Sequence, residues 1–537
     1  MTGAINRRRA APRYRCLRRY GRPGSPRDES LFTPSRKLNS NPVWELNRSG
    51  CEGDHQAADQ ELMMTHALVV GAGPTGLVTA MLLAAEGWRV TVVDRDPAHP
   101  SGDATDVWTH WKRPGVNQFA LTHCLMPGGL RVLANELPDT VTRLRELGAR
   151  DHNMIGGAWG YGNTGAEEPT DTRFKTLATR RPVLEAALLA TARETPGITI
   201  RRGLEVTGLL TGDAHTSGRP HITGITTSTG ESFQGNLVID AGGRNSRVAE
   251  LLADVGATAH TERAETGFRY YSRHFRSTDG TLPRQAPWPL YHHDSVSLIT
   301  APGDNDTWSV TLVTSGRDQE LRALSNSDVW QRTVALYPDV AHWATHGEPI
   351  TGVLAMAGTE SKYRRFIDGE LPVATGIFAV GDAWATTNPQ FGLGMALGFT
   401  HATMLRDLVR MVGTDDPVEL ALRFDSATEQ HLTPGWHSLA AWDRHRLAEV
   451  DADIRGVTYK TDDFDWNLNV ALESARWKDP AILRGMAEVA CALATAEDAL
   501  VKKGLVEKTV TLGADGPRHS DEGPSRRELL AIAGADA

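Results

Sequence analysis

The stretch HALVVGAGPTG, from His66 to Gly76, decides the fold, because an apolar run typical of a buried strand leads into glycines spaced as G-x-G-x-x-G. Gly71 permits a tight turn after the strand, and Gly73 lets the backbone approach a pyrophosphate. Gly76 lets the following helix, expected over Leu77–Ala85, pack closely on the strand. The N-terminus of that helix would offer free N–H groups to phosphates. The stretch therefore predicts an α/β unit that binds a dinucleotide.

Two later strands each end at an acid. The strand expected over Arg89–Val93 leads to Asp94, where a carboxylate would hold the adenosine ribose. The segment NLVIDAGGRNSR, Asn236–Arg247, runs from an apolar strand into Asp240 and a glycine turn. Alone, this second segment could be any junction between a strand and a helix. It is informative only together with the segments before and after it.

A third segment repeats the pattern near residue 380. GIFAVGDA is followed by NPQFGLGM, so a strand places Asp382 at its carboxyl end, where ligands of open α/β sheets bind. Gly392 and Gly394 then open a helix that runs to about Met411. The N-terminus of that helix would stabilise negative charge on a reduced ring.

The order and spacing of the three segments resemble the flavoprotein monooxygenase superfamily that includes aromatic hydroxylases and squalene-type epoxidases. The resemblance implies that the first segment binds the ADP half of FAD, that the second lies beside the pyrophosphate and the nicotinamide approach, and that the third binds the ribityl chain and flavin ring. One departure is Ala241, which stands where the family's middle motif has glycine.

A narrower resemblance, to an actinobacterial epoxidase-like branch of that superfamily, runs from about Met64 to Val510. It is carried by RPGVNQ (113–118) with His123, RPVLE (181–185), GFRYYSR (267–273) and NPQFGLGM (388–395). Asn117, Leu121, Phe391 and Leu393 depart from the pattern of that branch, all near the expected flavin or substrate. The departures leave FAD binding in place and bear on the substrate and the reaction.

The resemblance implies an FAD-dependent monooxygenase that inserts one oxygen atom into an organic substrate, by hydroxylation or epoxidation, through a flavin hydroperoxide and in secondary metabolism. Because only one dinucleotide fingerprint is present, NADPH or NADH is expected as a transient electron donor, or a separate flavin reductase takes its place. Ser246 and Arg247 favour direct use of NAD(P)H. The alternatives are an FAD-dependent double-bond reductase or dehydrogenase, and a non-catalytic binding module with this fold. The halogenase motif W-x-W-x-I-P is absent.

Three residues are candidates for catalysis: His123, Tyr271 and Arg273, with Phe391 as a further pocket residue. His123 could be a general acid or base or a buried imidazole, and Tyr271 could equally belong to the core. No metal site is expected, since the adjacent His292 and His293 would point apart on a strand. The residues expected to bind FAD are Gly71, Gly73, Thr75, Gly76, Asp94, Arg95, Arg113, Gln118, Arg181, Asp240, Asp382, Pro389, Gly392, Gly394 and Met395.

The expected fold class is α/β, a Rossmann-like FAD-binding domain interleaved with a mixed β-sheet substrate domain and a helical C-terminal region. Strands are expected at 267–275, 295–300 and 308–313, and Asp416-Pro417 and Asp479-Pro480 are expected to begin helices. The expected divisions are 1–63, a disordered extension, a misassigned start or a targeting peptide; 64–265, FAD-binding; 266–365, substrate sheet; 366–412, FAD-binding; 413–510, helical; and 511–537, a disordered tail.

Composition narrows the function classes. The net charge of −9 and the pI near 6.1 over 537 residues argue against a nucleic-acid partner. The four cysteines form no C-x-x-C pair, so a disulfide framework or structural zinc is not expected and the cytoplasm is the predicted compartment. No stretch predicts a membrane span. The expected partner is a small organic substrate.

Overall fold

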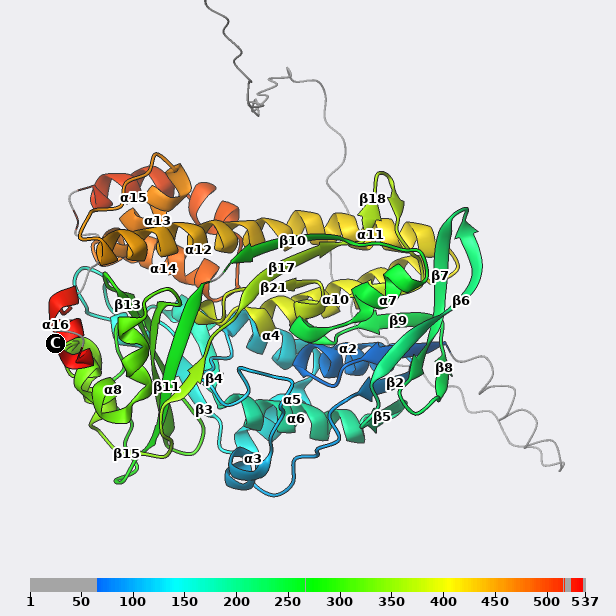
Figure 1. Cartoon of the computed structure of the whole chain (residues 1–537), viewed down its shortest axis with the longest axis horizontal. Helices are drawn as coiled ribbons and strands as arrows, with labels where there is room; N and C mark the ends of the chain where they lie inside the picture. Colours follow the sequence, from blue (N-terminus) through cyan, green and yellow to red (C-terminus); the bar gives the residue numbers. More distant parts are fainter. Residues whose placement is uncertain (1–64, 266, 515, 517–522, 535–537) are drawn as a thin grey trace, which may run out of the picture. The chain divides into compact units, whose positions relative to one another are not determined.

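The computed structural model describes residues 65–265, 267–514, 516 and 523–534 (Figure 1). The extension predicted over residues 1–63 lies outside the described residues. All described residues belong to one compact unit.

A parallel sheet of five strands carries the three sequence segments. Its order is β20-β9-β1-β2-β5, and each neighbouring pair is parallel. Because the carboxyl ends of parallel strands meet at one edge, the residues that follow β1, β9 and β20 come together there. The strands are β1 (His66–Val70), β2 (Arg89–Asp94), β5 (Ile198–Arg202), β9 (Leu237–Asp240) and β20 (Ile377–Ala379).

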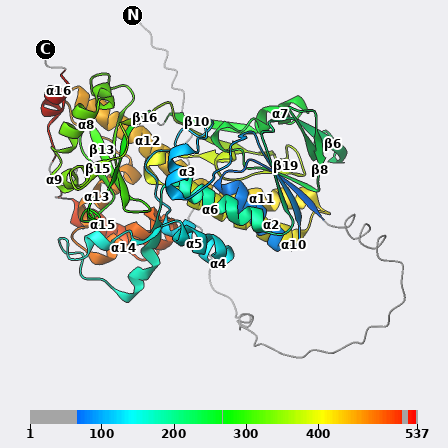
Figure 2. The same cartoon turned by 90° about the horizontal axis from the view of Figure 1, so that it is seen from below.

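Alternate residues of β1 face two different layers, as the period of a strand requires. Ala67 and Val69 pack in a core with three helices, whereas Leu68 packs in a second core on the opposite face. Figure 2 shows the two layers on either side of the parallel strands. The helices are α2 (Pro74–Ala85), α6 (Arg181–Glu194) and α10 (Gly394–Val412); the other layer holds α7 (Val248–Asp254) and the antiparallel strands β6 (Val206–Thr216), β7 (Arg219–Thr227) and β8 (Ser232–Gln234).

A second, antiparallel sheet has the order β12-β13-β14-β11-β15, with β16 also paired to β11. The three strands predicted at 267–275, 295–300 and 308–313 are confirmed as β11, β13 and β14. One face of this sheet packs on α8 (Ser327–Val334), and the other face packs on α12 (Thr433–Ile454). The elements are β11 (Phe268–Arg276), β12 (Leu290–His292), β13 (Val296–Pro302), β14 (Thr307–Ser315), β15 (Glu348–Pro349), β16 (Leu354–Met356), α8 (Ser327–Val334) and α9 (Pro338–Ala341).

A three-stranded sheet, β10-β17-β21, runs between the two larger sheets (Figure 1). Its strands are β10 (His260–Glu265), β17 (Glu360–Arg365) and β21 (Ala385–Thr386). The remaining elements before β5 and after β17 are α3 (Ala104–His110), α4 (Pro127–Glu136), α5 (Pro138–Glu146), β3 (Arg150–Asn153), β4 (Lys175–Ala178), β18 (Ile367–Asp368) and β19 (Leu371–Pro372).

Helices make up the C-terminal region, as predicted. Asp416 and Asp479 each cap a helix that opens with proline, and their carboxylates accept backbone N–H bonds of the first turn. None of the described helices is both long and apolar enough to span a membrane. The helices are α11 (Pro417–His431), α12 (Thr433–Ile454), α13 (Phe464–Ala475), α14 (Pro480–Ala490) and α15 (Leu505–Gly513).

The prediction of a disordered tail over 511–537 is wrong for the residues that the structure describes. Residues 511–513 complete α15, and Arg526–Ala533 form helix α16. A capping box between Ser525 and Glu528 starts α16, and Leu529, only 2% exposed, packs in the core of the second sheet. The short helix α16 was not predicted, because the tail is polar in composition and the helix buries only one apolar side chain, Leu529.

Candidate functional site

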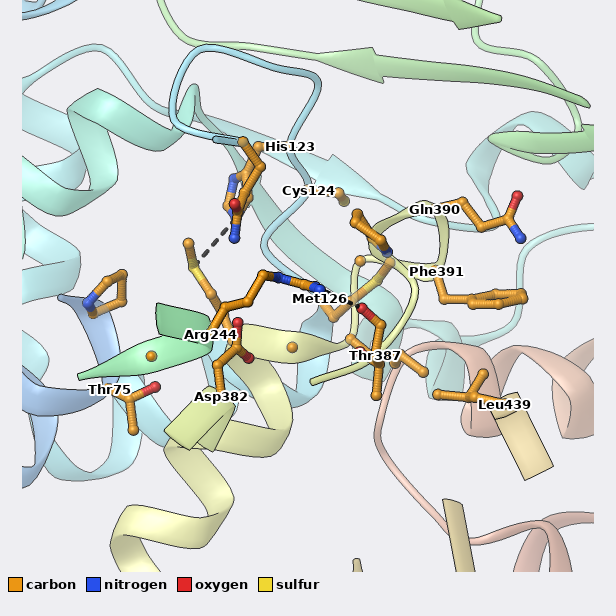
Figure 3. A pocket seen from close by; sticks show the side chains of 18 of the residues that line it. Thr75, His123, Cys124, Met126, Arg244, Asp382, Thr387, Gln390, Phe391 and Leu439 are labelled. Carbon is orange, nitrogen blue, oxygen red and sulfur yellow. Dashed lines mark hydrogen bonds between the residues drawn. The ribbon is translucent and has the colours of Figure 1, made fainter. Parts of the chain in front are cut away.

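A cavity of about 830 Å³ opens at the carboxyl edge of the parallel sheet and extends toward the C-terminal helices. Its volume lies in the range of cofactor and ligand sites. Figure 3 shows Thr75, His123, Arg244 and Asp382 around one part of it. The predicted residues that line it are Gly71, Gly73, Thr75, Asp94, Arg95, Arg113, Gln118, His123, Arg181, Asp382, Pro389, Phe391, Gly392, Gly394 and Met395.

The three glycines of the first turn have three different surroundings. Gly71 has a φ of +106°, and a Cβ there would lie 2.5 Å from the carbonyl oxygen of Ala241. A Cβ at Gly76 would lie 2.0 Å from the carbonyl oxygen of Gly71, so this residue serves close packing and does not line the cavity. Gly73 lines the cavity, and a Cβ there would meet nothing within 4 Å. The turn therefore leaves open backbone where a pyrophosphate was predicted.

Asp94 is held by backbone and by an arginine. Its Oδ2 accepts hydrogen bonds from the N–H of Ala72 at 2.6 Å and from Nη2 of Arg113 at 3.1 Å. The Arg113 side chain, 7% exposed, also pairs with Asp96 and Glu185. Burial alone would lower the pKa of Arg113, but Glu185 and Asp94 outweigh it and raise that pKa above its usual value. Arg113 thus ties the end of β2 to α6, which sequence reasoning had not predicted.

Arg181 pairs with Glu185, one of the carboxylates that Arg113 also contacts. Its Nε donates to Oε1 of Glu185 at 2.7 Å, and Arg181 also lines the cavity. Glu185 is buried between the two guanidinium groups, and despite that burial they lower its pKa. The segment Arg181–Glu185 therefore contributes an ion-pair network with Arg113 beside the cavity.

Asp240 does not line the cavity but supports the turn of the second motif through hydrogen bonds. It is 2% exposed and accepts hydrogen bonds from the hydroxyl of Ser246 and the N–H of Gly242. Burial raises the pKa of Asp240 to about 6. The turn that it supports, residues 241–247, does line the cavity. Among these residues Ala241 lies against Gly76, so its methyl group fills the space that the glycine leaves.

Asp382 lines the cavity after β20, and burial raises its pKa. Arg244 lies beside it (Figure 3), and the two positive charges of Arg244 and Arg181 partly oppose that rise in the pKa of Asp382. Arg244 donates to the carbonyl oxygens of Glu360 at 2.6 Å and Thr387 at 3.3 Å. It was not predicted, although it lies inside the quoted DAGGRNSR segment.

His123 lies in the cavity wall with its Nε2 3.3 Å from the sulfur of Met395, the dashed contact in Figure 3. Burial, with a smaller contribution from Arg181, lowers the pKa of His123 to about 4. The imidazole is therefore neutral at pH 7 and suits hydrogen bonding better than a role as a protonated acid.

Tyr271 and Arg273 do not line the cavity. Their side chains lie on the face of β11 that packs on α8, where Arg273 donates to Gln331 and Tyr271 belongs to the buried core. Because strand side chains alternate, Tyr270 faces the opposite way and its hydroxyl donates to Oδ1 of Asn388. Neither tyrosine lines the cavity, and nothing in two adjacent tyrosines reveals which one contacts the third motif.

Asn388 links the third motif to α12. Its Nδ2 donates to Oδ1 of Asp443 at 2.6 Å, and Asp443 is 1% exposed. Burial raises the pKa of Asp443 to about 8. Sequence reasoning missed Asp443, because an acid in the polar helix segment AAWDRHRL carries no mark of burial.

Aromatic side chains line the part of the cavity toward α12 and α13. The ring centroid of Trp442 lies 4.9 Å from that of Phe391, 5.0 Å from that of His292 and 6.2 Å from that of Trp466. Trp288 also lines this part. His292 takes part in no metal cluster, since no group of three His, Cys, Asp or Glu side chains in the described part of the chain could hold an ion. We refer to this aromatic part of the cavity as the chamber.

Known proteins resemble this chain over most of its length. Protein Rv3254 of Mycobacterium tuberculosis (strain ATCC 25618 / H37Rv) is 28% identical over 417 residues, which cover 72% of this chain and 82% of that protein. The FAD-dependent monooxygenase atnJ of Arthrinium sp is 23% identical over 403 residues, which cover 69% and 82%. The crystal structure of PqsL, a probable FAD-dependent monooxygenase from Pseudomonas aeruginosa, shares the fold with a TM-score of 0.53 and 16% identity, over 72% of this chain and 97% of that one.

A family model described as FAD dependent oxidoreductase matches residues 66–405. The match begins at β1 and ends within α10, so it contains all three motifs that meet at the cavity. The recognition of a flavoprotein family from the sequence is confirmed, and so is the α/β fold class. The chain belongs to the FAD dependent oxidoreductase family.

Proposed function

We propose that the protein is an FAD-dependent monooxygenase that inserts one oxygen atom into an organic substrate, by hydroxylation or epoxidation, as part of secondary metabolism in the cytoplasm. The observation that carries this proposal is the continuity of the cavity. One cavity contains the motif residues Gly73, Asp382 and Gly394 and also the chamber side chains Trp442 and Trp466. A cofactor bound at the motifs would therefore face the chamber.

The residues fit FAD along its length. The open backbone at Gly73 and the N-terminus of α2 suit the pyrophosphate, and Asp94 suits the ribose. Asp382 suits the ribityl chain, and the N-terminus of α10, beginning at Gly394, suits negative charge on the reduced ring. Bound FAD supplies, once reduced, the electrons that activate oxygen.

The remaining tasks fall to the chain itself. The aromatic rings of the chamber exclude water and hold a substrate by its flat faces. Neutral His123 offers hydrogen bonding in the cavity wall without adding a charge. The two sides of this arrangement, a cofactor end built from the three motifs and a substrate end with aromatic walls, match transfer of oxygen to an organic molecule better than hydrolysis.

We propose NADPH or NADH as a transient electron donor. Ser246 and Arg247 line the cavity mouth, where Arg247 is exposed and pairs only loosely with Glu205 and Glu250, at 3.5 and 3.4 Å. An exposed guanidinium at the cavity suits transient binding of a molecule that carries phosphate groups, such as NADPH or NADH. A separate flavin reductase is the alternative, and an enzyme that is reduced by added reduced flavin but never by NAD(P)H would favour it.

The test is NAD(P)H oxidation by the purified protein with polyenes, terpenoids and phenols, with oxygen uptake and product mass measured. A monooxygenase gives one oxygen atom in the product for each NAD(P)H consumed. A double-bond reductase would add hydrogen without oxygen uptake. A gently purified protein without flavin absorption would contradict the proposal and would favour a binding module.

Asp382→Ala tests the placement of the cofactor. Loss of charge-assisted hydrogen bonds to a bound ligand costs about 1.5–3 kcal/mol each, so FAD affinity should fall roughly tenfold to a hundredfold. Asp382→Asn, which keeps a hydrogen-bonding side chain, should lose less. Asp213→Ala, at an exposed position of β6, is the control. Full flavin occupancy in Asp382→Ala at low FAD concentration would contradict the placement.

A further inference from the structure

The Gln390 side chain lines the cavity and is 5% exposed, yet none of the described residues gives a hydrogen-bond partner to its Oε1 or to its Nε2. A buried amide without partners costs about 1–3 kcal/mol. Buried polar groups are almost always paired in proteins, so both atoms of this amide call for a partner that enters the cavity.

The loop that carries Gln390 is held firmly on two sides. The backbone N–H of Gln390 donates to Oδ1 of Asn388 at 3.1 Å, and Tyr270 donates to the same oxygen from β11. Asn388 in turn donates to Asp443 on α12. The backbone at Gln390 is therefore held in place before any ligand binds, which reduces the entropy lost on binding.

The direction of the side chain separates it from the cofactor motifs. Figure 3 shows Gln390 and Phe391 extending from their loop in a common direction, away from Asp382 and Arg244. The ring of Phe391 meets Trp442 edge to face in the chamber. Gln390 thus extends toward the same end of the cavity as Phe391, the end that we assign to the substrate.

We infer that Gln390 selects a planar aromatic substrate that carries an N–H next to a carbonyl group, as a lactam or a carboxamide does. The carbonyl oxygen of such a ligand accepts from Nε2, and its N–H donates to Oε1, so one bidentate contact pairs both atoms of the amide. The aromatic rings of the chamber cover the faces of the same ligand. This inference rests on the proposed function, because it assigns the chamber to the substrate.

The test uses the FAD-loaded protein and three bicyclic probes of similar size. 2-Quinolone has an adjoining N–H and C=O, coumarin has only the acceptor, and naphthalene has neither. Binding is followed by the change in flavin absorbance. The wild type should bind 2-quinolone roughly tenfold more tightly than coumarin, since coumarin leaves Oε1 unpaired. Gln390→Met should reduce that preference to less than about twofold.

Gln234→Met is the matched control, since Gln234 lies exposed on β8, away from the cavity lining, and it should keep the wild-type preference. The unfolding temperature of Gln390→Met should equal or exceed that of the wild type, because an unpaired buried amide has been removed. Equal binding of 2-quinolone and coumarin, no binding of 2-quinolone by the wild type, or an unchanged preference in Gln390→Met would overturn the inference.

The pyrimidine edge of the flavin ring carries the same donor and acceptor pattern. Lower FAD affinity in Gln390→Met with the probe preference intact would show that the amide contacts the cofactor, which also overturns the inference. Failure of the inference about Gln390 can be distinguished from failure of the proposed function. A protein that inserts oxygen but ignores Gln390 contradicts only the inference, whereas probe selection through Gln390 without any oxygen insertion supports the inference and contradicts the proposed function.

Discussion

Asp443 shows how one buried carboxyl can link pH to the site. It is almost fully enclosed, its one hydrogen-bond partner among the described residues is the amide of Asn388, and burial raises its pKa to about 8. An unfolded chain would release this proton near pH 4. The folded protein therefore binds the proton over a range in which the unfolded chain does not, and the neutral acid is the form that stabilises the fold.

The sign of the effect follows from that difference in proton binding. Where the native state holds more protons, the free energy of unfolding falls as pH rises. Between about pH 4 and pH 8, Asp443 should lower it by up to roughly 1.4 kcal/mol for each pH unit. Asp443→Asn keeps an acceptor for Asn388 and removes the titration. We expect the stability of the variant relative to the wild type to rise by a few kcal/mol between pH 5 and pH 8.

Denaturant unfolding of the FAD-loaded proteins at pH 5, 6.5 and 8 checks this prediction. Other groups titrate in both proteins, Asp240 among them, so only the difference between wild type and variant is informative. A difference that stays constant over the three pH values would show that Asp443 does not hold its proton in the folded protein.

Single residues were predicted unevenly from the sequence. The sequence could identify Gly71, Gly73 and Asp382 as cavity residues, because the surroundings of each depend on a turn only a few residues long. Tyr270 was missed because the sequence does not state which face of β11 meets the third motif, and Asp443 was missed because burial of α12 depends on distant strands. Arg113, which the sequence predicts to bind FAD, lines the cavity, but its pairing with Asp94, Asp96 and Glu185 depends on the assembled fold.

At the scale of elements, the junction of β1 and α2 separates packing from binding. A methyl group at position 76 would collide with the carbonyl oxygen of Gly71 at 2.0 Å, whereas a methyl group at position 73 would meet no protein atom within 4 Å. Gly73 also has a φ of −81°, which any residue adopts without strain. The same substitution at the two positions should therefore have different consequences.

Gly76→Ala should push α2 away from β1 and cost roughly 1–3 kcal/mol of stability, with loss of FAD. Gly73→Ala should leave the unfolding of the flavin-free protein within about 0.5 kcal/mol of the wild type and still weaken FAD binding, because the methyl group occupies the approach of the pyrophosphate. Thermal unfolding of the flavin-free forms and FAD titration of each variant separate the two effects. If Gly73→Ala binds FAD as the wild type does, the pyrophosphate does not lie at this turn.

Elements with a strong local signal were predicted, and elements defined by distant partners were not. The strands of the second sheet and the proline-started helices α11 and α14 follow from alternation and capping. Helix α16 did not emerge, because its one buried leucine is a weak periodic signal in a charged tail. Its stability comes from tertiary contacts that no window of sequence contains.

At the scale of the whole molecule, the cavity joins two kinds of structure. Its cofactor end is built from three motifs that belong to one parallel sheet. The chamber is built from β12, α12 and α13, which come from separate stretches of chain and meet only in the folded protein. For this reason the sequence could predict a cofactor, whereas the shape of the chamber could be seen only in the structure.

The C-terminal helix α16 provides a test of how the two ends of the molecule depend on each other. Arg526 pairs with Asp318 at 2.7 Å, and the Asp318 side chain has no exposed surface. Leu529 fills the core of the second sheet. Breaking such a buried pair costs about 3–5 kcal/mol, and exposing a buried leucine costs about 1.5–3 kcal/mol. None of the α16 residues lines the cavity.

Removal of residues 525–537 should therefore lower the thermal unfolding midpoint by several degrees and leave the FAD affinity of the folded protein unchanged. Arg526→Ala should reproduce part of the loss, whereas Arg527→Ala, at the exposed neighbouring position, should not. Differential scanning calorimetry and FAD titration of the three variants give the comparison. A truncated protein that unfolds like the wild type would mean that α16 does not stabilise the second sheet. Loss of FAD at temperatures where the truncated protein is still folded would instead show that the sheet and the cofactor end are energetically coupled through the chamber between them.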